Sequence, residues 1–103
     1  MGNKKNNIKC YNAGKISGLS YLTARYKFEK FDKTIKDMGM IPVNPMEDGL
    51  KANRPWWMHL LYDLSLLLRC ECVLFHPDWE DSKGAKIEFK IAKMLGKKII
   101  LTV

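Results

Sequence analysis

The sequence predicts a small α/β domain, a Rossmann-like or flavodoxin-like three-layer sandwich with a four-stranded parallel sheet. Short apolar runs of strand length alternate with longer segments of helical periodicity, in the order β-α-β-α-β-α-β. No internal repeat and no Pro/Gly/Ser-rich linker interrupts this order, so the 103 residues are expected to form a single domain. Parallel strands need right-handed crossovers, which place helices on both faces of the sheet.

The first half of the chain is predicted to form a strand, a helix and a second strand. Residues 8–13 form the first strand, and the loop Gly14–Gly18 follows it. From about Ser20, apolar residues recur three or four positions apart, which is the spacing of one helical face. These residues are Ala24, Phe28, Phe31, Ile35 and Met38. Gly39 is a typical residue just past a helix end, and residues 40–43 form the second strand.

The second half is predicted to continue with two helices and two strands. Asn44 and Pro45 favour an extended or turn conformation, and residues 46–53 are expected to be a loop. Pro55 suits the first turn of a helix that runs to about Arg69, and we expect this apolar helix to be buried. The remaining elements are a strand over 72–76, a polar loop over 77–82, a helix over 83–95 ended by Gly96, and a strand over 98–103.

Charge and hydropathy limit the partners and the location of the protein. The chain has 18 Lys and Arg against 11 Asp and Glu, a net charge of +7, but the lysines are spread along it and arginine is scarce. A diffuse positive field attracts any polyanion, so a basic nucleic-acid accessory protein is one hypothesis, although no recognition motif supports it. The longest apolar stretch is shorter than the roughly 20 residues that span a bilayer. Residues 1–9 are polar and lack an apolar segment, so we expect a cytoplasmic protein with no membrane contact.

The cysteines indicate buried thiols. Three is an odd number, and Cys70 and Cys72 lie one residue apart in an apolar run, where a disulfide framework is implausible. Structural zinc sites favour C-x2-C or C-x4-C pairs, and neither occurs here. We therefore expect neither a metal nor a cofactor.

The last helix places one acidic residue in an unexpected position. At about 100° per residue, Glu88 lies at the centre of the apolar face, and the lysines of this helix lie on the opposite side. The apolar face contains Gly84, Ala85, Ile91, Ala92 and Leu95, and the opposite side contains Lys83, Lys86, Lys90 and Lys93. A buried carboxylate is costly unless it is paired, hydrogen-bonded or protonated. Glu88 is thus either a functional carboxylate beneath a ligand pocket or a buried acceptor of backbone hydrogen bonds.

Other polar residues cluster where a ligand is expected, at the carboxyl ends of the strands. Asp63 lies at the edge of the apolar stripe of its helix, one turn from His59; the two form either a surface hydrogen bond or, with Glu88, part of a catalytic set. The loop Gly14–Gly18 precedes a helix, whose amides favour an anion. Ser82 is a typical N-cap, and a phosphate could compete for the same amides.

Taken together, these residues resemble the nucleoside 2-deoxyribosyltransferase-like superfamily, and within it a small branch of uncharacterised bacterial and phage domains. The resemblance covers nearly the whole chain. It is carried by Tyr11 to Gly18, Val43-Asn44-Pro45, Tyr62-Asp63-Leu64, and Pro77 through Gly84-Ala85-Lys86-Ile87-Glu88 to Ala92 and Gly96-Lys97-Lys98.

The resemblance implies cleavage of an N-glycosidic bond in a nucleoside or nucleoside 5′-monophosphate. It assigns the nucleophile to Glu88 and positioning roles to Asp63 and Tyr11. Substrate-binding residues are expected at Gly14, Lys15, Ser17, Gly18, Asn44, Ser82 and Gly84. Serine at position 82, where transferases often have aspartate, favours a monophosphate substrate. The alternative hypothesis is a non-catalytic module that binds or senses a nucleotide.

We also expect a homo-oligomer, a dimer or larger. Members of the superfamily use C-terminal or partner-subunit residues to close the pocket. In this chain, Trp56, Trp57, Met58 and Tyr62 exceed what one helical stripe needs to bury, so part of this surface is predicted to face a partner.

Overall fold

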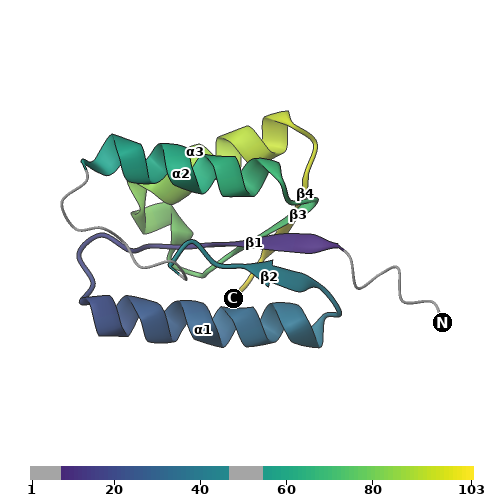
Figure 1. Cartoon of the computed structure of the whole chain (residues 1–103), viewed down its shortest axis with the longest axis horizontal. Helices are drawn as coiled ribbons and strands as arrows, with labels where there is room; N and C mark the ends of the chain where they lie inside the picture. The colour runs from purple at the N-terminus through teal and green to yellow at the C-terminus, as the bar shows by residue number, and fades with distance from the viewer. Residues whose placement is uncertain (1–7, 47–54) are drawn as a thin grey trace.

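The computed structural model describes residues 8–46 and 55–103, and it confirms the predicted fold class. Most of the predicted loop over 46–53 lies outside the described residues. Four parallel strands alternate with three helices (Figure 1). The elements are β1 (Lys9–Ala13), α1 (Tyr21–Asp37), β2 (Ile41–Val43), α2 (Trp56–Leu68), β3 (Cys72–Phe75), α3 (Lys83–Met94) and β4 (Lys98–Leu101).

The strand order determines where a ligand can bind. The order is β2-β1-β3-β4, and all three neighbouring pairs are parallel. Helix α1 covers one face of the sheet, and α2 and α3 cover the other (Figure 1). From β1 the chain passes to β2 on one side and then to β3 on the other, so the order reverses between β1 and β3. In open α/β sheets the ligand crevice lies at such a point, beyond the carboxyl ends of the two strands.

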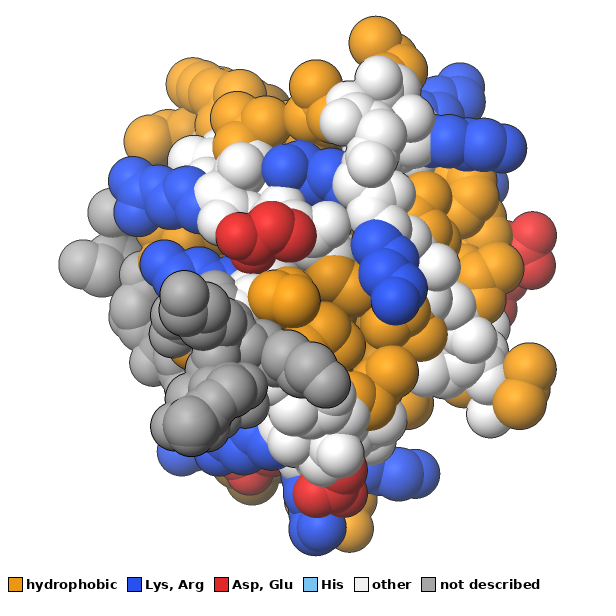
Figure 2. Space-filling model, turned by 90° about the vertical axis from the view of Figure 1, so that its right-hand side faces the viewer, with side chains coloured by type: hydrophobic (Ala, Val, Ile, Leu, Met, Phe, Trp, Pro, Cys, Tyr) orange, Lys and Arg blue, Asp and Glu red, His pale blue; other side chains and the backbone are white. Residues whose placement is uncertain are grey.

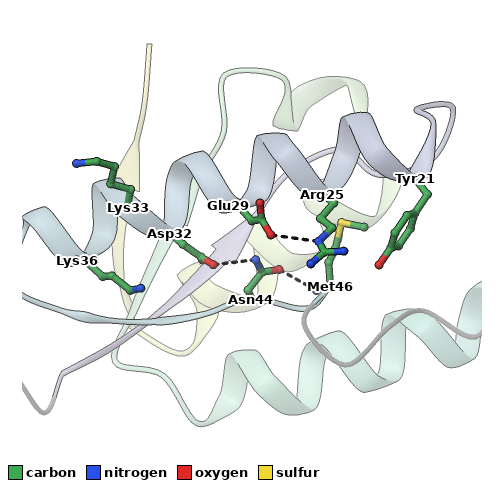
Figure 3. A pocket seen from close by; sticks show the side chains of 8 residues that line it. All are labelled: Tyr21, Arg25, Glu29, Asp32, Lys33, Lys36, Asn44 and Met46. Atoms are coloured by element: carbon green, nitrogen blue, oxygen red, sulfur yellow. Dashed lines mark hydrogen bonds and ion pairs between the residues drawn. The ribbon is translucent and has the colours of Figure 1, made fainter.

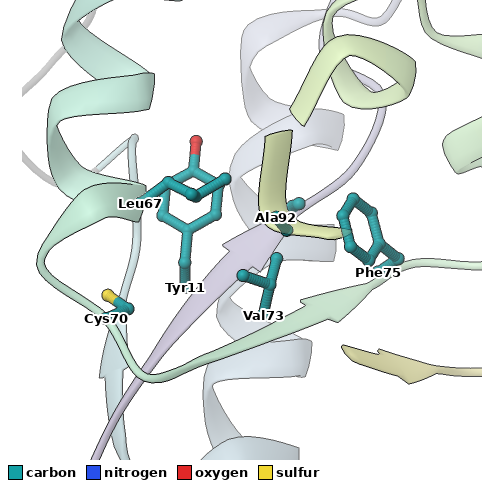
Figure 4. Close-up of a cluster of buried hydrophobic side chains, with 7 residues drawn as sticks. Tyr11, Leu67, Cys70, Val73, Phe75 and Ala92 are labelled. Atoms are coloured by element: carbon teal, nitrogen blue, oxygen red, sulfur yellow. The ribbon is translucent and has the colours of Figure 1, made fainter. Parts of the chain in front are cut away.

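The core follows the alternation of side chains along β1 and β3. Cys10 and Cys72 are direct register partners and pack with Ile35 of α1. On the other face, Tyr11 and Val73 are register partners and belong to a cluster beneath α2 and α3. Figure 4 shows this second cluster. Its buried members are Tyr11, Ala13, Leu67, Cys70, Val73, Phe75 and Ala92. Because the two faces of β1 and β3 are both covered, β3 is apolar throughout and β1 is buried from Cys10 to Ala13.

The helix ends confirm the predicted start and stop signals. The Ser20 hydroxyl accepts a hydrogen bond from Thr23 N at 3.1 Å, and the Ser82 hydroxyl accepts one from Ala85 N at 3.1 Å. Both serines are therefore N-caps, of α1 and α3 respectively. Gly39 and Gly96 follow the last residues of these helices with φ of +85° and +71°, a conformation that glycine adopts without steric cost.

The structure corrects the prediction that α2 is a buried helix. Within it only Leu67 is fully buried, whereas Trp57, Leu61 and Leu68 are each more than half exposed. A helix in an outer layer buries one side, and the apolar composition of α2 conceals which side that is. Two smaller differences concern the ends of elements. Part of the predicted loop over 77–82 is a short 3-10 helix, Trp79–Asp81, and the last strand ends at Leu101.

Two further observations concern the helices and the thiols. Within residues 8–46 and 55–103, no helix has the length and apolarity needed to cross a membrane. The three cysteines are buried free thiols, as predicted. Cys10 and Cys72 lie on the α1 side of the sheet, whereas Cys70 belongs to the cluster beneath α2 and α3.

Candidate functional site

A hollow of about 120 Å³ lies beyond the carboxyl ends of β1 and β3, where the strand order reverses. Three segments supply its walls: the loop after β1, one side of α2, and the first turns of α3. The lining residues are Gly14, Ile16, Ser17, Trp56, His59, Leu60, Asp63, Ser82, Gly84, Ala85 and Glu88. This is the position that the topology predicts for a ligand.

Glu88 lines this hollow and is only 4% exposed, which confirms its predicted burial. The Tyr11 hydroxyl donates a hydrogen bond to Glu88 Oε2 at 2.7 Å. In Figure 4 the phenol of Tyr11 rises from β1 beside Leu67, with its hydroxyl at the end remote from the strand. The sequence left two interpretations of Glu88 open. The structure does not support the one in which Glu88 accepts backbone hydrogen bonds, because its hydrogen-bond donor is the side chain of Tyr11.

The environment of Glu88 favours its neutral form. Burial, and to a smaller extent the nearby charge of Asp63, raise the pKa of Glu88 from 4.5 to about 8, although the hydrogen bond from Tyr11 opposes this rise. Burial and the charge of Glu88 also raise the pKa of Tyr11 well above its ordinary value, so Tyr11 remains a hydrogen-bond donor. At neutral pH Glu88 is therefore mostly protonated.

The structure brings together the three residues predicted to be catalytic. Asp63 and His59 line the hollow from α2, and Glu88 lines it from α3. Tyr11 reaches Glu88 from β1. Periodicity placed Glu88 on the inner side of α3, but the proximity of Asp63 and Glu88 depends on how α2 and α3 lie over the sheet.

The loop after β1 is held in place by residues that the sequence did not single out. Lys27 Nζ of α1 donates to the backbone oxygen of Lys15 at 2.7 Å and to Asp78 Oδ2 at 2.6 Å. Asp78 Oδ1 in turn accepts from the Lys15 amide at 3.2 Å. Burial favours a higher pKa for Asp78, but the hydrogen bonds from Lys27 and Lys15 outweigh it and lower the pKa. The loops that follow β1 and β3 are thus fixed to each other.

His76 lies directly after β3, one residue beyond the observed end of the strand predicted over 72–76, and its contacts were not predicted. Its ring is fully buried between Phe28 and Phe31, and Nε2 is hydrogen-bonded to Asn12 Oδ1. Burial, assisted by the charge of Lys27, lowers the pKa of His76 to about 3, so the ring is neutral. A Cβ added to Gly14 would overlap this ring. Glycine at position 14 is therefore explained by packing against His76 as well as by its place in the hollow wall.

A second, wider hollow of about 490 Å³ shares part of the wall of the first. The two have Ser17, Trp56, Ser82 and Gly84 in common. The wider hollow adds two lysines, Lys15 and Lys83, together with Asp81. The first hollow has the carboxyl groups of Asp63 and Glu88 in its wall, whereas the second has two ammonium groups and one carboxylate.

Two of the predicted substrate-binding residues lie apart from both hollows. Asn44 is on the α1 side, where its Nδ2 donates to Asp32 Oδ2 at 2.9 Å and its Oδ1 accepts from Met46 N at 2.8 Å. Figure 3 shows this region, a groove along α1 in which Arg25 is paired with Glu29 and Asn44 is bonded to Asp32. Gly18 has φ of +86°, so a turn accounts for glycine there. Asn44 follows β2, which is an edge strand, so it does not lie at the crevice between β1 and β3.

The basic residues of the described surface are spread out rather than gathered in one patch. The lysines of α3 predicted to face solvent, at positions 83, 86, 90 and 93, are exposed. Figure 2 shows that, on the face it presents, Lys and Arg side chains are separated by hydrophobic and uncharged groups. Among the described residues, no three His, Cys, Asp or Glu side chains are grouped so as to hold a metal ion.

Comparisons with known proteins bear on the family. A search of curated proteins finds none that matches this chain. Comparison with protein families matches residues 8–101 to one described as a domain of unknown function, DUF4406. The match begins just before β1 and ends at the last residue of β4, so it spans the whole sheet and the candidate site. The chain therefore belongs to the DUF4406 family.

Proposed function

We propose that this protein cleaves the N-glycosidic bond of a nucleoside or nucleoside 5′-monophosphate, with Glu88 as the nucleophile. The observation that carries the proposal is a buried glutamate that accepts a hydrogen bond from Tyr11 and lines a hollow at the β1–β3 crevice. The resemblance to nucleoside 2-deoxyribosyltransferase-like proteins supports the same assignment. The residues that carry that resemblance include Tyr11, Asp63 and Glu88.

The proposed chemistry is a double displacement. A Glu88 oxygen forms an ester bond with the anomeric carbon as the carbon–nitrogen bond breaks, and the base leaves with that electron pair. Water or a second base then attacks the anomeric carbon and releases Glu88. A carboxylate close to the sugar also stabilises the positive charge that develops on it, and a site with little water strengthens this effect.

Proton balance gives Asp63 a role. Glu88 must lose its proton before it attacks, and the leaving base must gain one. Asp63 lines the same hollow, so we assign it to carry the proton between them. Tyr11, as a hydrogen-bond donor to Glu88 Oε2, stabilises the ionised carboxylate and orients it.

A 5′-monophosphate is the substrate form we favour. Lys15 and Ser17 line the wider hollow, and Ser82 lies at its boundary with the Glu88 hollow. The Ser82 hydroxyl accepts the cap hydrogen bond from Ala85 N, so its own proton can be donated to a phosphate oxygen. The first amides of α3 add a partial positive charge at the same place.

The test is release of free base from a panel of deoxynucleosides and their 5′-monophosphates, measured by chromatography. We expect release with the wild type, and none with Glu88→Ala or Glu88→Gln. Glu80→Gln, which alters an exposed glutamate outside both hollows, serves as the control and should retain activity. No release from any substrate would contradict the proposal.

One observation favours the non-catalytic alternative. Because burial raises the pKa of Glu88 to about 8, the carboxyl is protonated at neutral pH and is then not a nucleophile. A binding or sensing module predicts ligand-induced thermal stabilisation without turnover, largely retained in Glu88→Gln. The two functions are separated by running the chromatographic assay and the thermal shift on the same samples from pH 6 to pH 9.

We further propose that the protein self-associates through the exposed side of α2. Trp57, Leu61 and Leu68 lie at helical spacing and carry no charge, whereas the chain as a whole has a net charge of +7. Two copies of a neutral apolar surface meet without like-charge repulsion, as a two-fold interface requires. Leu61→Lys should convert a dimer to a monomer in light scattering, and Tyr26→Lys on exposed α1 should not. A monomeric wild type would refute this.

A further inference from the structure

The hollow around Glu88 is too small to hold a nucleotide. Its volume is about 120 Å³, whereas ligand pockets are typically about 300 to 1,000 Å³. If the sugar of the substrate occupies this hollow, as the proposed function requires, the base and the phosphate must extend into the wider one. That neighbouring hollow has a volume of about 490 Å³, which is large enough for both groups.

Trp56 stands at the boundary between these two spaces. Of the described residues, it is the one aromatic side chain that lines both hollows. It begins α2 and is 42% exposed, so much of its ring is open to solvent. A Cβ added to Gly84 would lie 3.9 Å from Trp56 Cζ2, so the absence of a side chain at Gly84 keeps the space beside the indole clear.

A nucleic-acid base can take the place of Lys83, the side chain that lies over the indole of Trp56. Lys83 Nζ lies over the ring, 5.1 Å from its centroid, on an exposed and flexible side chain. An exposed cation–π contact of this kind favours the arrangement with the ammonium group over the ring by only about two- to fivefold. Stacking of a nucleic-acid base on an aromatic side chain contributes about 5- to 150-fold in affinity. A stacked base can therefore displace the ammonium group from the ring, and Lys83 still lines the wider hollow.

The other two tryptophans have different surroundings. Trp79 stacks on Phe89, with ring centroids 4.4 Å apart, and also packs against Phe75, so it belongs to the core. Trp57 is exposed and lines neither hollow. Trp56 is thus the tryptophan whose surroundings suit a planar ligand.

We propose that Trp56 binds the base of the substrate by stacking, and that it thereby contributes to affinity while leaving the choice among bases broad. This inference rests on the proposed function. Stacking tolerates any base because every base has a π-face, so Trp56 selects for the presence of a base rather than its identity. Trp56 is a binding residue in this proposal, and the chemical step remains with Glu88.

The test uses the full-length chain and tryptophan fluorescence, with deoxynucleoside 5′-monophosphates and base-free 2-deoxyribose 5-phosphate as probes. Trp56→Ala should weaken binding of the monophosphates about tenfold or more and leave binding of the sugar phosphate unchanged. Trp56→Phe should retain most of the affinity, because it keeps a stacking surface. The matched control is Trp57→Ala, which removes the neighbouring tryptophan and should bind like the wild type. For the alanine variants, in which one fluorophore is lost, calorimetry gives the dissociation constants.

The outcomes separate this inference from the proposed function. If the wild type releases base but Trp56→Ala has an unchanged KM, the proposed function stands and the stacking role is refuted. Equal losses in Trp56→Ala and Trp57→Ala would also refute it, since they would indicate a general effect on α2. If the wild type neither binds nor cleaves any of the probes, both proposals fail. Circular dichroism of each variant verifies that it is folded, and Trp56→Phe provides the comparison should Trp56→Ala not fold.

Discussion

Replacing Glu88 by glutamine should stabilise the protein, increasingly so as the pH rises. The carboxyl has a pKa of about 8 in the folded chain and of 4.5 when unperturbed. Between these two values the unfolded chain releases a proton that the folded chain retains, so wild-type stability falls as the pH rises through this window. Above pH 8 Glu88 is ionised in the folded chain too, and the loss of stability reaches its full value. Glutamine keeps the shape and accepts the Tyr11 hydrogen bond, but it has no proton to lose.

The magnitude follows from the size of the pKa difference. One pKa unit corresponds to about 1.4 kcal/mol, so a rise from 4.5 to about 8 amounts to a penalty on the order of 5 kcal/mol at high pH. At pH 7 about 3 kcal/mol of it is already present, and at pH 5 about 1 kcal/mol. Domains of this kind have a total stability of about 5 to 15 kcal/mol, so the effect is large. Carboxylates with lowered pKa values, such as Asp78, respond in the opposite direction and lose their contribution in acid.

The assay is urea unfolding of the wild type and Glu88→Gln at intervals from pH 4 to pH 9. The quantity of interest is the difference in free energy of unfolding between the two proteins, relative to its value at pH 4. Glu80→Gln is the control, because it removes one carboxylate from an exposed position and so reports the effect of net charge alone. A difference that stays constant from pH 5 to pH 9 would refute the burial argument. Loss of base release together with a gain in stability would indicate that the carboxylate is maintained for function.

Three further predictions concern the walls of the site. Gly14→Ala should lower the free energy of unfolding by about 1 to 3 kcal/mol, because a Cβ there overlaps the His76 ring, and urea unfolding at pH 7 will measure it. Gly84→Ala, with 3.9 Å of clearance in the first turn of α3, should leave that free energy unchanged or raise it by up to about 1 kcal/mol, yet weaken nucleotide binding by calorimetry. Lys27→Met should remove the link to Asp78 and speed hydrogen exchange of the Lys15 amide, and unchanged exchange would contradict it.

Local patterns predicted most of the fold because its elements obey them. The 3.6-residue period of α3 placed Glu88 inward and the lysines outward, and both positions are found. Capping residues and glycines fixed the ends of α1 and α3 closely. The buried side of helix α2 was harder to predict, because α2 has apolar residues on all its sides. Periodicity alone then does not separate a buried side from an exposed one. The exposed side of α2 is determined by how the helix packs against the sheet and α3.

The parts of the site that the sequence did not predict depend on contacts between distant residues. Asn44 follows a strand, as Gly14 does, but the order β2-β1-β3-β4 puts the end of β2 at an edge, away from the crevice. Strand order is not encoded in any local pattern, so the sequence could not show which strand ends lie beside the crevice. The contacts of His76 and Lys27 could not be predicted for a related reason: a histidine at the end of an apolar strand and a lysine on a helix do not by themselves indicate a partner. Their importance comes from residues 12 and 78, which are far away in sequence.

The two neighbouring residues Tyr11 and Asn12 show why one face of the sheet is the better candidate for function. Alternation along β1 sends them to opposite faces, and both are buried and hydrogen-bonded. Asn12 Nδ2 donates to Phe28 O and to Asp32 Oδ1, which are a backbone and a side-chain oxygen of α1. Asp32 also accepts a hydrogen bond from Asn44. Tyr11 instead meets a carboxyl group that is nearly buried, costly to ionise and adjacent to open space. A polar network whose members bond to one another can be explained by stability alone. Glu88, whose burial lowers stability above pH 4.5, calls for a ligand as its explanation.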